Sequence, residues 1–286
     1  QAATKRVVCS LGVDRSRKLK QLAMSKGIRE LNINLTLFNI FLVALSGWLY
    51  RISDSRKMTI GAPAHNRSSL DFRETIGLFI EMFPLTIEHQ EQQTFRQLLS
   101  RIVVESQTWL RHAKPGTSSM AGIRQYNVVL NYIHATFDDF ADIPVEAEWI
   151  HTGYGDPRHS LRIQVHDFGD KGSFLLYFDF NQDTFDKDLQ NNAIAHFLAL
   201  LDAFIDNPDR RIDQVALANS GERQRYLIDY NNTQIPARST TTVLDLFKQH
   251  QPDIIIATTE LPIIDGISMC QSIRELDANV AIILVS

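Results

Sequence analysis

The sequence predicts an α/β fold, and three observations lead to that prediction. Apolar residues recur at helical spacing in two long segments before residue 113. Residues 161–168 and 173–181 alternate apolar and polar side chains around the turn at 169–172, as the strands of a hairpin do. Beyond residue 242, helical and strand patterns alternate. Such alternation is typical of a β-α-β unit in a parallel sheet.

The first 112 residues predict three strands and three helices. A strand at 7–13 precedes a helix over about 15–26. The second helix, at 34–51, has one apolar face, formed by Leu35, Phe38, Leu42, Leu45 and Leu49. A short strand at Met58 then enters a polar loop that opens on Gly61 and Pro63, and a second strand ends in Phe83-Pro84-Leu85. The third helix, at 93–112, buries a stripe made of Phe95, Leu98, Leu99, Ile102, Trp109 and Leu110.

Strands dominate the next part of the chain. We expect them at 127–137, at 146–151 with Trp149 as a bulky anchor, and in the hairpin described above. An amphipathic helix follows at 186–206, and Asn207-Pro208-Asp209 stops it.

The chain is predicted to contain a lobe at 1–215, a linker at 216–240 and a short tail at 241–286. Residues 222–240 are polar and rich in Asn, Ser and Thr, which is typical of a linker. The tail predicts a helix at 243–250, a strand at 253–257, a helix at 267–276 and a final strand.

Composition excludes several classes of function. A net charge of −4 gives no electrostatic reason to bind nucleic acid or an anionic membrane. The apolar stretch 35–50 is interrupted by Asn39, Ser46 and Gly47 and is shorter than the ~20 residues a bilayer needs, so we expect a buried helix and no membrane. Cys9 and Cys270 lie far apart in sequence and predict neither a disulfide framework nor a metal site, which favours a reducing cytoplasm.

The two ends indicate a chain taken from something longer. It begins at Gln1, and its polar, basic start does not resemble a signal peptide. The apolar run at 280–286 is typical of an interior strand that needs neighbours on both sides. We therefore expect a fragment of a larger protein or a gene remnant.

Three motifs resemble a known family. They are Gly61-x-Pro-x-x-x-Arg67, the segment Ile76-Gly-Leu-Phe that continues to Phe83-Pro84-Leu85, and the strand 127–132, NVVLNY. Together they resemble the C-terminal lobe of condensation domains from nonribosomal peptide synthetases. Glu81 and Met82 replace the usual Asn-Thr of that family. The resemblance implies half of a chloramphenicol-acetyltransferase-like fold, a mixed sheet with flanking helices. It also implies a parent reaction that forms an amide bond between carrier-bound acyl and aminoacyl groups.

The resemblance assigns roles to two residues, but the chain lacks the catalytic motif of the family. Arg67 corresponds to an arginine that pairs with an aspartate across the lobe interface, and Asn131 to a residue beside the substrate channel. The family's catalytic His-His-x-x-x-Asp-Gly motif belongs to the N-terminal lobe, and none of the nine histidines here forms part of one. We therefore predict no catalytic residue and no amide formation by this chain alone.

The resemblance also implies the partners. They are peptidyl or acyl carrier proteins bearing phosphopantetheine, the missing N-terminal condensation lobe, and an adenylation domain. The adenylation domain is implied because residues 221–223 and 230–233 resemble the linker that leads to one. No cofactor is expected to bind the chain directly.

The tail, from Pro252 to Gly266 and beyond, resembles a truncated response-regulator receiver. The resemblance places Thr258 at the phosphoacceptor position, where receivers carry an aspartate, and Ser286 at the switch position. Threonine cannot form an acyl phosphate, so the alternative function is a receiver-like module that binds a signalling partner without phosphoryl transfer.

Two other groupings are interpreted as structural. His134 with Asp138 and Asp139 has a spacing that a metal could use, but it sits at the end of a predicted strand. His166-Asp167 lies in the predicted hairpin. No metal site is predicted.

Overall fold

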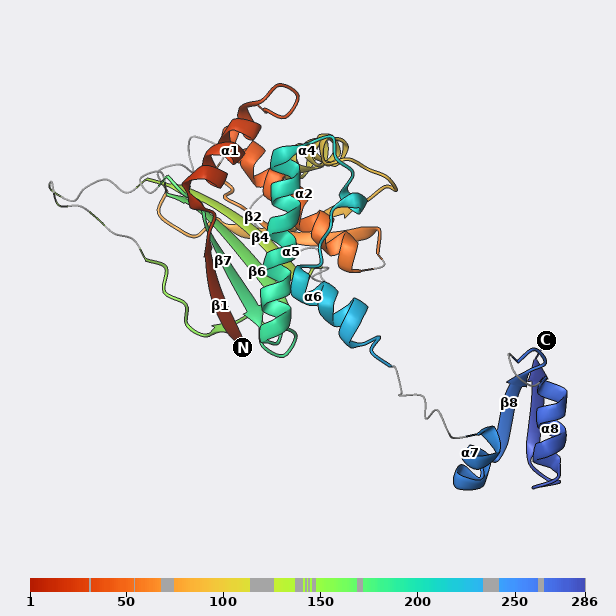
Figure 1. Cartoon of the computed structure of the whole chain (residues 1–286). Coiled ribbons are helices and arrows are strands. Elements are labelled where there is room, and N and C mark those ends of the chain that lie inside the picture. Colours follow the sequence, from red (N-terminus) through yellow and green to blue (C-terminus); the bar gives the residue numbers. More distant parts are fainter. Residues whose placement is uncertain are drawn as a thin grey trace. The chain divides into compact units, whose positions relative to one another are not determined.

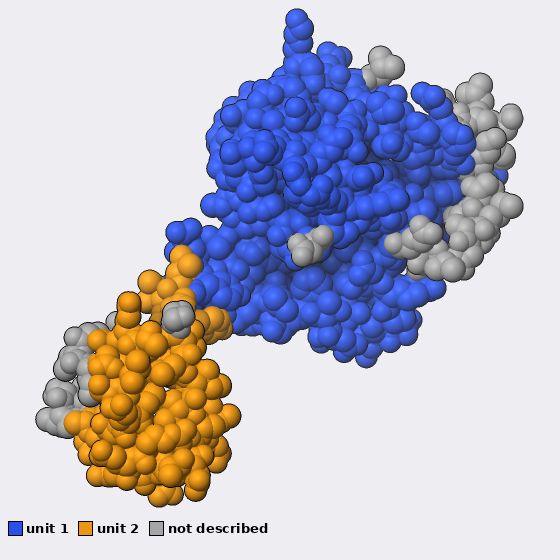
Figure 2. All heavy atoms as spheres, turned by 90° about the vertical axis from the view of Figure 1, so that its right-hand side faces the viewer, with its two compact units in different colours: residues 1–226 blue, residues 227–286 orange. Residues whose placement is uncertain are grey.

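A computed structural model describes residues 1–30, 32–53, 55–67, 75–113, 126–136, 141, 143, 145, 148–168, 172–233, 242–261 and 265–285. The chain forms two compact units, Gln1–Tyr226 and Leu227–Ser286 (Figures 1 and 2). The finer predicted division at 215 and 240 stays a prediction.

Unit 1 is a mixed sheet covered on one face by helices (Figure 1). Its described strands are β1 (Ala2–Ser10), β2 (Lys57–Ala64), β3 (Glu81–Glu88), β4 (Val128–Ala135), β5 (Tyr154–Gly155), β6 (Leu161–Phe168) and β7 (Leu175–Asn181). Its longer helices are α1 (Gly12–Met24), α2 (Ile33–Ile52), α4 (Phe95–His112) and α5 (Lys187–Asp206). Shorter helical segments follow at η2 (Ile212–Gln214) and α6 (Ser220–Gln224), and η3 (Arg225–Asp229) spans the boundary between the two units.

The strand order of this sheet is β3-β2-β4-β6-β7-β1-β5. β4 runs parallel to β2 and β6, while β6–β7, β7–β1 and β2–β3 are antiparallel. The expected hairpin is confirmed by the β6–β7 register, which pairs Leu161 with Phe180.

The core lies between the sheet and the helices. Alternate residues of β6 and β7 point into it, and the rings of Phe178 and Phe197 meet edge to face with centroids 5.7 Å apart. α2 is buried on most of its circumference, so the expectation of one apolar face was too narrow. By length and composition α2 could also cross a membrane, but 72% of its apolar window is buried inside this unit.

Helix ends follow the capping chemistry of the sequence. The Asn32 side chain accepts hydrogen bonds from the backbone N–H groups of Asn34 and Leu35 at the start of α2. Thr94 and Gln97 form a capping box at the start of α4. These caps fix where both helices begin, and both helices contribute to the site described below.

The other face of the sheet carries a buried ion-pair cluster centred on Asp179. Its carboxylate accepts two hydrogen bonds from Arg6, at 2.6 and 2.9 Å, and further ones from Arg162 and Gln164. The Asp179 side chain is only 4% exposed. Burial raises the pKa of Asp179, but the hydrogen bonds and charges of the two arginines lower it more, so the carboxyl pKa lies below its usual value.

Two local predictions were wrong, and the predicted linker is helical in its first part. Residues 61–64 continue β2 instead of opening a loop, because β2 pairs with β3 as far as Ala64 opposite Glu81. Residues 148–151 form no strand, and Trp149 is 41% exposed. The first part of the predicted linker is helical as far as residue 229. Asn219 and Glu222 form a capping box at the start of this helical part.

Unit 2 is a small parallel pair of strands with two helices. It consists of α7 (Val243–His250), β8 (Ile254–Thr258), α8 (Gly266–Arg274) and β9 (Ala281–Val285). β8 and β9 are parallel, with Ile254 opposite Ala281, so the predicted β-α-β unit is confirmed. Its core is Phe247, Met269, Ile273 and Val280.

Candidate functional site

A pocket opens where two neighbouring strands separate. β2 and β4 are registered only at Ile60–Val128 and Gly61–Val129. Beyond these pairs β2 stays with β3 and β4 stays with β6. A cavity of about 330 Å³ lies between the diverging ends.

Gly61 stands at the branch point of the fork. A Cβ atom there would lie 2.4 Å from Cε2 of Tyr126, well inside van der Waals contact. Only glycine lets the Tyr126 ring pack directly on the β2 backbone at this point.

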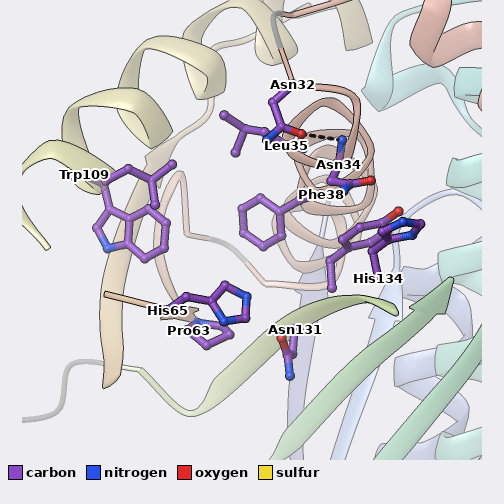
Figure 3. A pocket seen from close by; sticks show the side chains of 11 residues that line it. Asn32, Asn34, Leu35, Phe38, Pro63, His65, Trp109, Asn131 and His134 are labelled. Atoms are coloured by element: carbon purple, nitrogen blue, oxygen red, sulfur yellow. Dashed lines mark hydrogen bonds between the residues drawn. The ribbon is translucent and has the colours of Figure 1, made fainter. Parts of the chain in front are cut away.

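The pocket combines an apolar wall with polar groups. Side chains from the start of α2, the end of α4, the end of β2 and the second half of β4 surround it (Figure 3). The apolar wall comprises Leu35, Phe38, Pro63, Trp109 and Leu110. The polar lining comprises Asn32, Asn34, His65, Asn131, Tyr132 and His134. A mainly apolar pocket with a few placed polar groups is the usual form of a small-molecule site.

Asn131, the predicted channel residue, lines this pocket from β4. It is registered with Gln164 of β6 and is partly buried. Among the described residues, nothing is hydrogen bonded to its side-chain amide. The amide is therefore available to a ligand as both donor and acceptor.

A second polar group closes one end of the pocket. His134 and Asp167 are paired across the parallel strands β4 and β6, and Nδ1 of His134 lies 3.4 Å from Oδ2 of Asp167. The Tyr132 hydroxyl donates to the same Oδ2 at 3.0 Å, and Lys20 Nζ donates to Oδ1 at 2.9 Å. Burial raises the pKa of Tyr132, and the Asp167 charge raises it further, so the phenol stays a proton donor.

Arg67, the predicted interlobe residue, is engaged within its own lobe. Nη1 donates to the Thr75 carbonyl and Nη2 to the Gly77 carbonyl, both at 2.7 Å. The guanidinium also lies over the Phe79 ring, 4.6 Å from its centroid. Arg67 therefore contacts residues 75–79 of unit 1, and its pairing with a second lobe stays a prediction.

The predicted tail positions lie in unit 2. Thr258 ends β8, and its hydroxyl accepts a hydrogen bond from the Glu260 N–H at 3.3 Å. Asp265 caps α8 by accepting from the Ser268 N–H at 2.8 Å and from its hydroxyl. Ser286 lies outside the described residues.

The described part of the chain contains no group of three or more His, Cys, Asp or Glu side chains that could hold a metal ion. Asp138 and Asp139, which the sequence placed near His134, are not among the described residues.

Sequence reasoning missed the contribution of Asp167 and underrated His134. The two residues are 33 positions apart, and only the parallel register of β4 and β6 pairs them. The available signal for this pair was the position of a histidine and an aspartate near the ends of two predicted strands. This signal indicates a contact only once the strand order is known.

Comparison with known proteins gives a consistent result. A family model described as "Condensation domain" matches residues 4–227. Surfactin synthase subunit 1 of Bacillus subtilis is 22% identical over 75% of this chain and 6% of its own length. Bacitracin synthase 1 of Bacillus licheniformis is 21% identical over 85% of this chain and 5% of its own length. The chain thus spans a small part of these relatives.

Solved structures share the fold. The first condensation domain of the calcium-dependent antibiotic synthetase matches with a TM-score of 0.60 and 16% identity, over 77% of this chain and 48% of that one. The condensation domain of the Monacolin K polyketide synthase MokA matches with a TM-score of 0.62 and 15% identity, over 73% and 48%. The α/β fold with a mixed sheet is therefore that of condensation domains, whereas the comparisons give no support to a receiver segment in the tail. Because the family model matches most of the chain, this protein belongs to the condensation-domain family of nonribosomal peptide synthetases.

Proposed function

We propose that this chain is the C-terminal lobe of a condensation domain, and that its pocket forms one wall of the channel in which a carrier-bound thioester reacts with an amine. The observation behind the proposal is the pocket between β2 and β4, which has an apolar wall and the Asn131 amide. The apolar wall can pack against an acyl chain, while the amide can hold the polar thioester or amine without ionising. Phosphopantetheine would enter as part of a carrier protein.

The catalytic step needs a second lobe in this proposal. The sequence holds no His-His-x-x-x-Asp-Gly motif, so the partner lobe would supply it. Arg67 stands in the loop after β2 and would meet the aspartate of that motif, exchanging one of its contacts with the carbonyls of Thr75 and Gly77. The chain alone would bind carriers but form no amide.

A carrier pull-down tests this proposal. The full chain is immobilised and offered a carrier protein bearing acylated phosphopantetheine, with the unmodified carrier as the control. We expect selective retention of the acylated carrier and an approximately threefold to tenfold weaker affinity in N131A, because one hydrogen bond contributes about 1 kcal/mol. Equal retention of both carriers would contradict the proposal. Amide formation from two loaded carriers, with this chain as the only catalyst, would overturn its dependence on a second lobe.

For unit 2 we propose a protein-binding role without phosphoryl transfer. Thr258 ends β8 in place of a carboxylate, Asp265 is used as a helix cap, and the outer face of the sheet exposes apolar side chains, with Ile256 70% exposed. Incubation with radiolabelled acetyl phosphate should leave the chain unlabelled. Stable labelling that disappears in D265N would refute this proposal.

A further inference from the structure

One arrangement in the pocket is not used by the proposed function. His134 lines the pocket from the end of β4 and is backed by Asp167 of β6. A histidine held by a carboxylate beside a ligand pocket is the pairing that acid–base enzymes use to orient a proton acceptor.

The aspartate is held firmly in place. Its side chain is 8% exposed and is fixed by the Tyr132 hydroxyl at 3.0 Å and the Lys20 ammonium at 2.9 Å. Tyr132 is partly buried and packs against the core, with its ring centroid 6.4 Å from that of Phe41. The carboxylate therefore has little freedom to turn away from His134.

The contact with Asp167 determines which ring nitrogen of His134 is available. Nδ1 is the ring nitrogen beside the carboxylate, 3.4 Å from Oδ2 of Asp167. A proton on Nδ1 suits a carboxylate neighbour, so we assign Nε2 as the proton acceptor. The His134 side chain is 42% exposed, so water reaches it.

Other polar groups of the pocket are less suited to accept a proton. Its three asparagine side chains do not ionise in the ordinary pH range. His65 is exposed, and no described carboxylate lies in ion-pair contact with it. His134 is therefore the lining residue with a built-in orienting partner.

We propose that His134, oriented by Asp167, is a general base that hydrolyses acyl thioesters in this pocket. This inference rests on the proposed function, which brings a pantetheine thioester to the pocket. Nε2 removes a proton from water while the water oxygen bonds to the thioester carbonyl carbon. The carbon–sulfur bond then breaks, and the departing thiolate takes the proton from Nε2. The products are a carboxylic acid and a free thiol, and the histidine is regenerated.

The favoured substrate has an apolar acyl group. Figure 3 shows Trp109 on the side of the pocket away from His134, with Leu35 and Phe38 between them. A medium-length acyl chain can pack there while its thioester faces His134. A charged acyl group would lose hydration in the same place without gaining a partner of opposite charge.

The test uses the full chain and the hexanoyl thioester of N-acetylcysteamine, a small mimic of the pantetheine arm. Thiol release is followed with a chromogenic disulfide. We expect H134A to lose at least about a hundredfold of the rate above buffer, since general bases contribute roughly 10²–10⁴. Added imidazole should restore part of the rate of H134A, which a merely structural role would not produce. H112Q removes an exposed histidine of α4 that does not line the pocket and should hydrolyse like the wild type.

A further variant separates the base from its support. Y132F keeps the ring but removes one hydrogen bond to Asp167, and should lower the rate less than H134A does, without a response to imidazole. Its fold is checked by thermal melting.

The inference is overturned by a wild-type rate equal to buffer, by an unaltered rate in H134A, or by an equal loss in H65Q. Hydrolysis of the small thioester without retention of acylated carrier would contradict the proposed function but support His134 as the general base. Retention of acylated carrier without hydrolysis would support the proposed function but contradict the role of His134.

Discussion

His89 provides a quantitative prediction about pH and stability. Its ring is stacked on Tyr50 of α2, with centroids 4.7 Å apart and planes 4° from parallel, and the residue is 2% exposed. Neither ring nitrogen has a hydrogen-bond partner among the described residues. Burial, with a further contribution from the positive charge of Arg101, lowers the pKa of His89 from 6.5 to about 4.

The sign and the size follow from proton linkage. Between the folded pKa near 4 and the unfolded pKa of 6.5, the unfolded chain binds a proton that the folded chain does not. Stability is therefore unaffected by His89 well above 6.5 and falls as the pH is lowered through this window. At about pH 4.5 the two pKa values correspond to a loss of about 2.5 kcal/mol.

The perturbation is H89F, which keeps an aromatic ring against Tyr50 and removes the titrating group. Urea unfolding is followed by tryptophan fluorescence at about pH 7.5 and about pH 4.5. All three tryptophans, Trp48, Trp109 and Trp149, belong to unit 1, so the signal reports on the unit that contains His89. The acid-induced loss of stability should be about 2.5 kcal/mol smaller in H89F than in the wild type.

A matched control isolates the effect of burial. H112Q replaces a solvent-exposed histidine of the same unit and should keep the wild-type pH dependence. His166 is also buried, with its pKa lowered to about 4 by burial and then by Arg6, so the wild type and both variants share its contribution. The reasoning would be refuted by an H89F variant whose stability falls with pH as steeply as that of the wild type.

Three further substitutions test the packing. G61A places a Cβ 2.4 Å from the Tyr126 ring and should cost about 1–3 kcal/mol in urea unfolding; a loss below about 0.5 kcal/mol would contradict the close packing at the fork. D179A leaves the mostly buried Arg6 and the partly exposed Arg162 without their carboxylate and should cost about 3 kcal/mol, and an unchanged unfolding midpoint would show that the cluster contributes nothing. F197A empties a fully buried ring site and should cost about 3–5 kcal/mol; recovery of wild-type stability would mean that the helix repacks completely.

Local patterns in the sequence identified most of the elements. The predicted strand at 161–168 coincides with β6, and the predicted helix at 243–250 coincides with α7. Both have a clear period and a clear boundary, a turn in one case and the Thr242 cap in the other. The predictions failed where local chemistry misleads, as at Pro63, whose position in β2 is stabilised by pairing with β3 rather than by its own propensity.

The candidate site was only partly accessible in this way. Asn131 was identified through a resemblance in the strand that carries it, and the structure places it on a pocket. No periodicity marks the place where β2 and β4 part, because the separation depends on which neighbour each strand keeps along its length. The pocket is therefore a property of the sheet rather than of any segment.

The sequence by itself determined the family, the absence of its catalytic histidine motif and the succession of helices and strands, because these depend on residues near one another in the chain. Only the tertiary structure decided that His134 faces Asp167, that Asp179 gathers two arginines, and that His89 is buried without a hydrogen-bond partner among the described residues. Each of these depends on strand register or helix packing, which bring together side chains distant in sequence. The energies of such contacts come from burial and from charge at short range, and neither exists until the chain has folded.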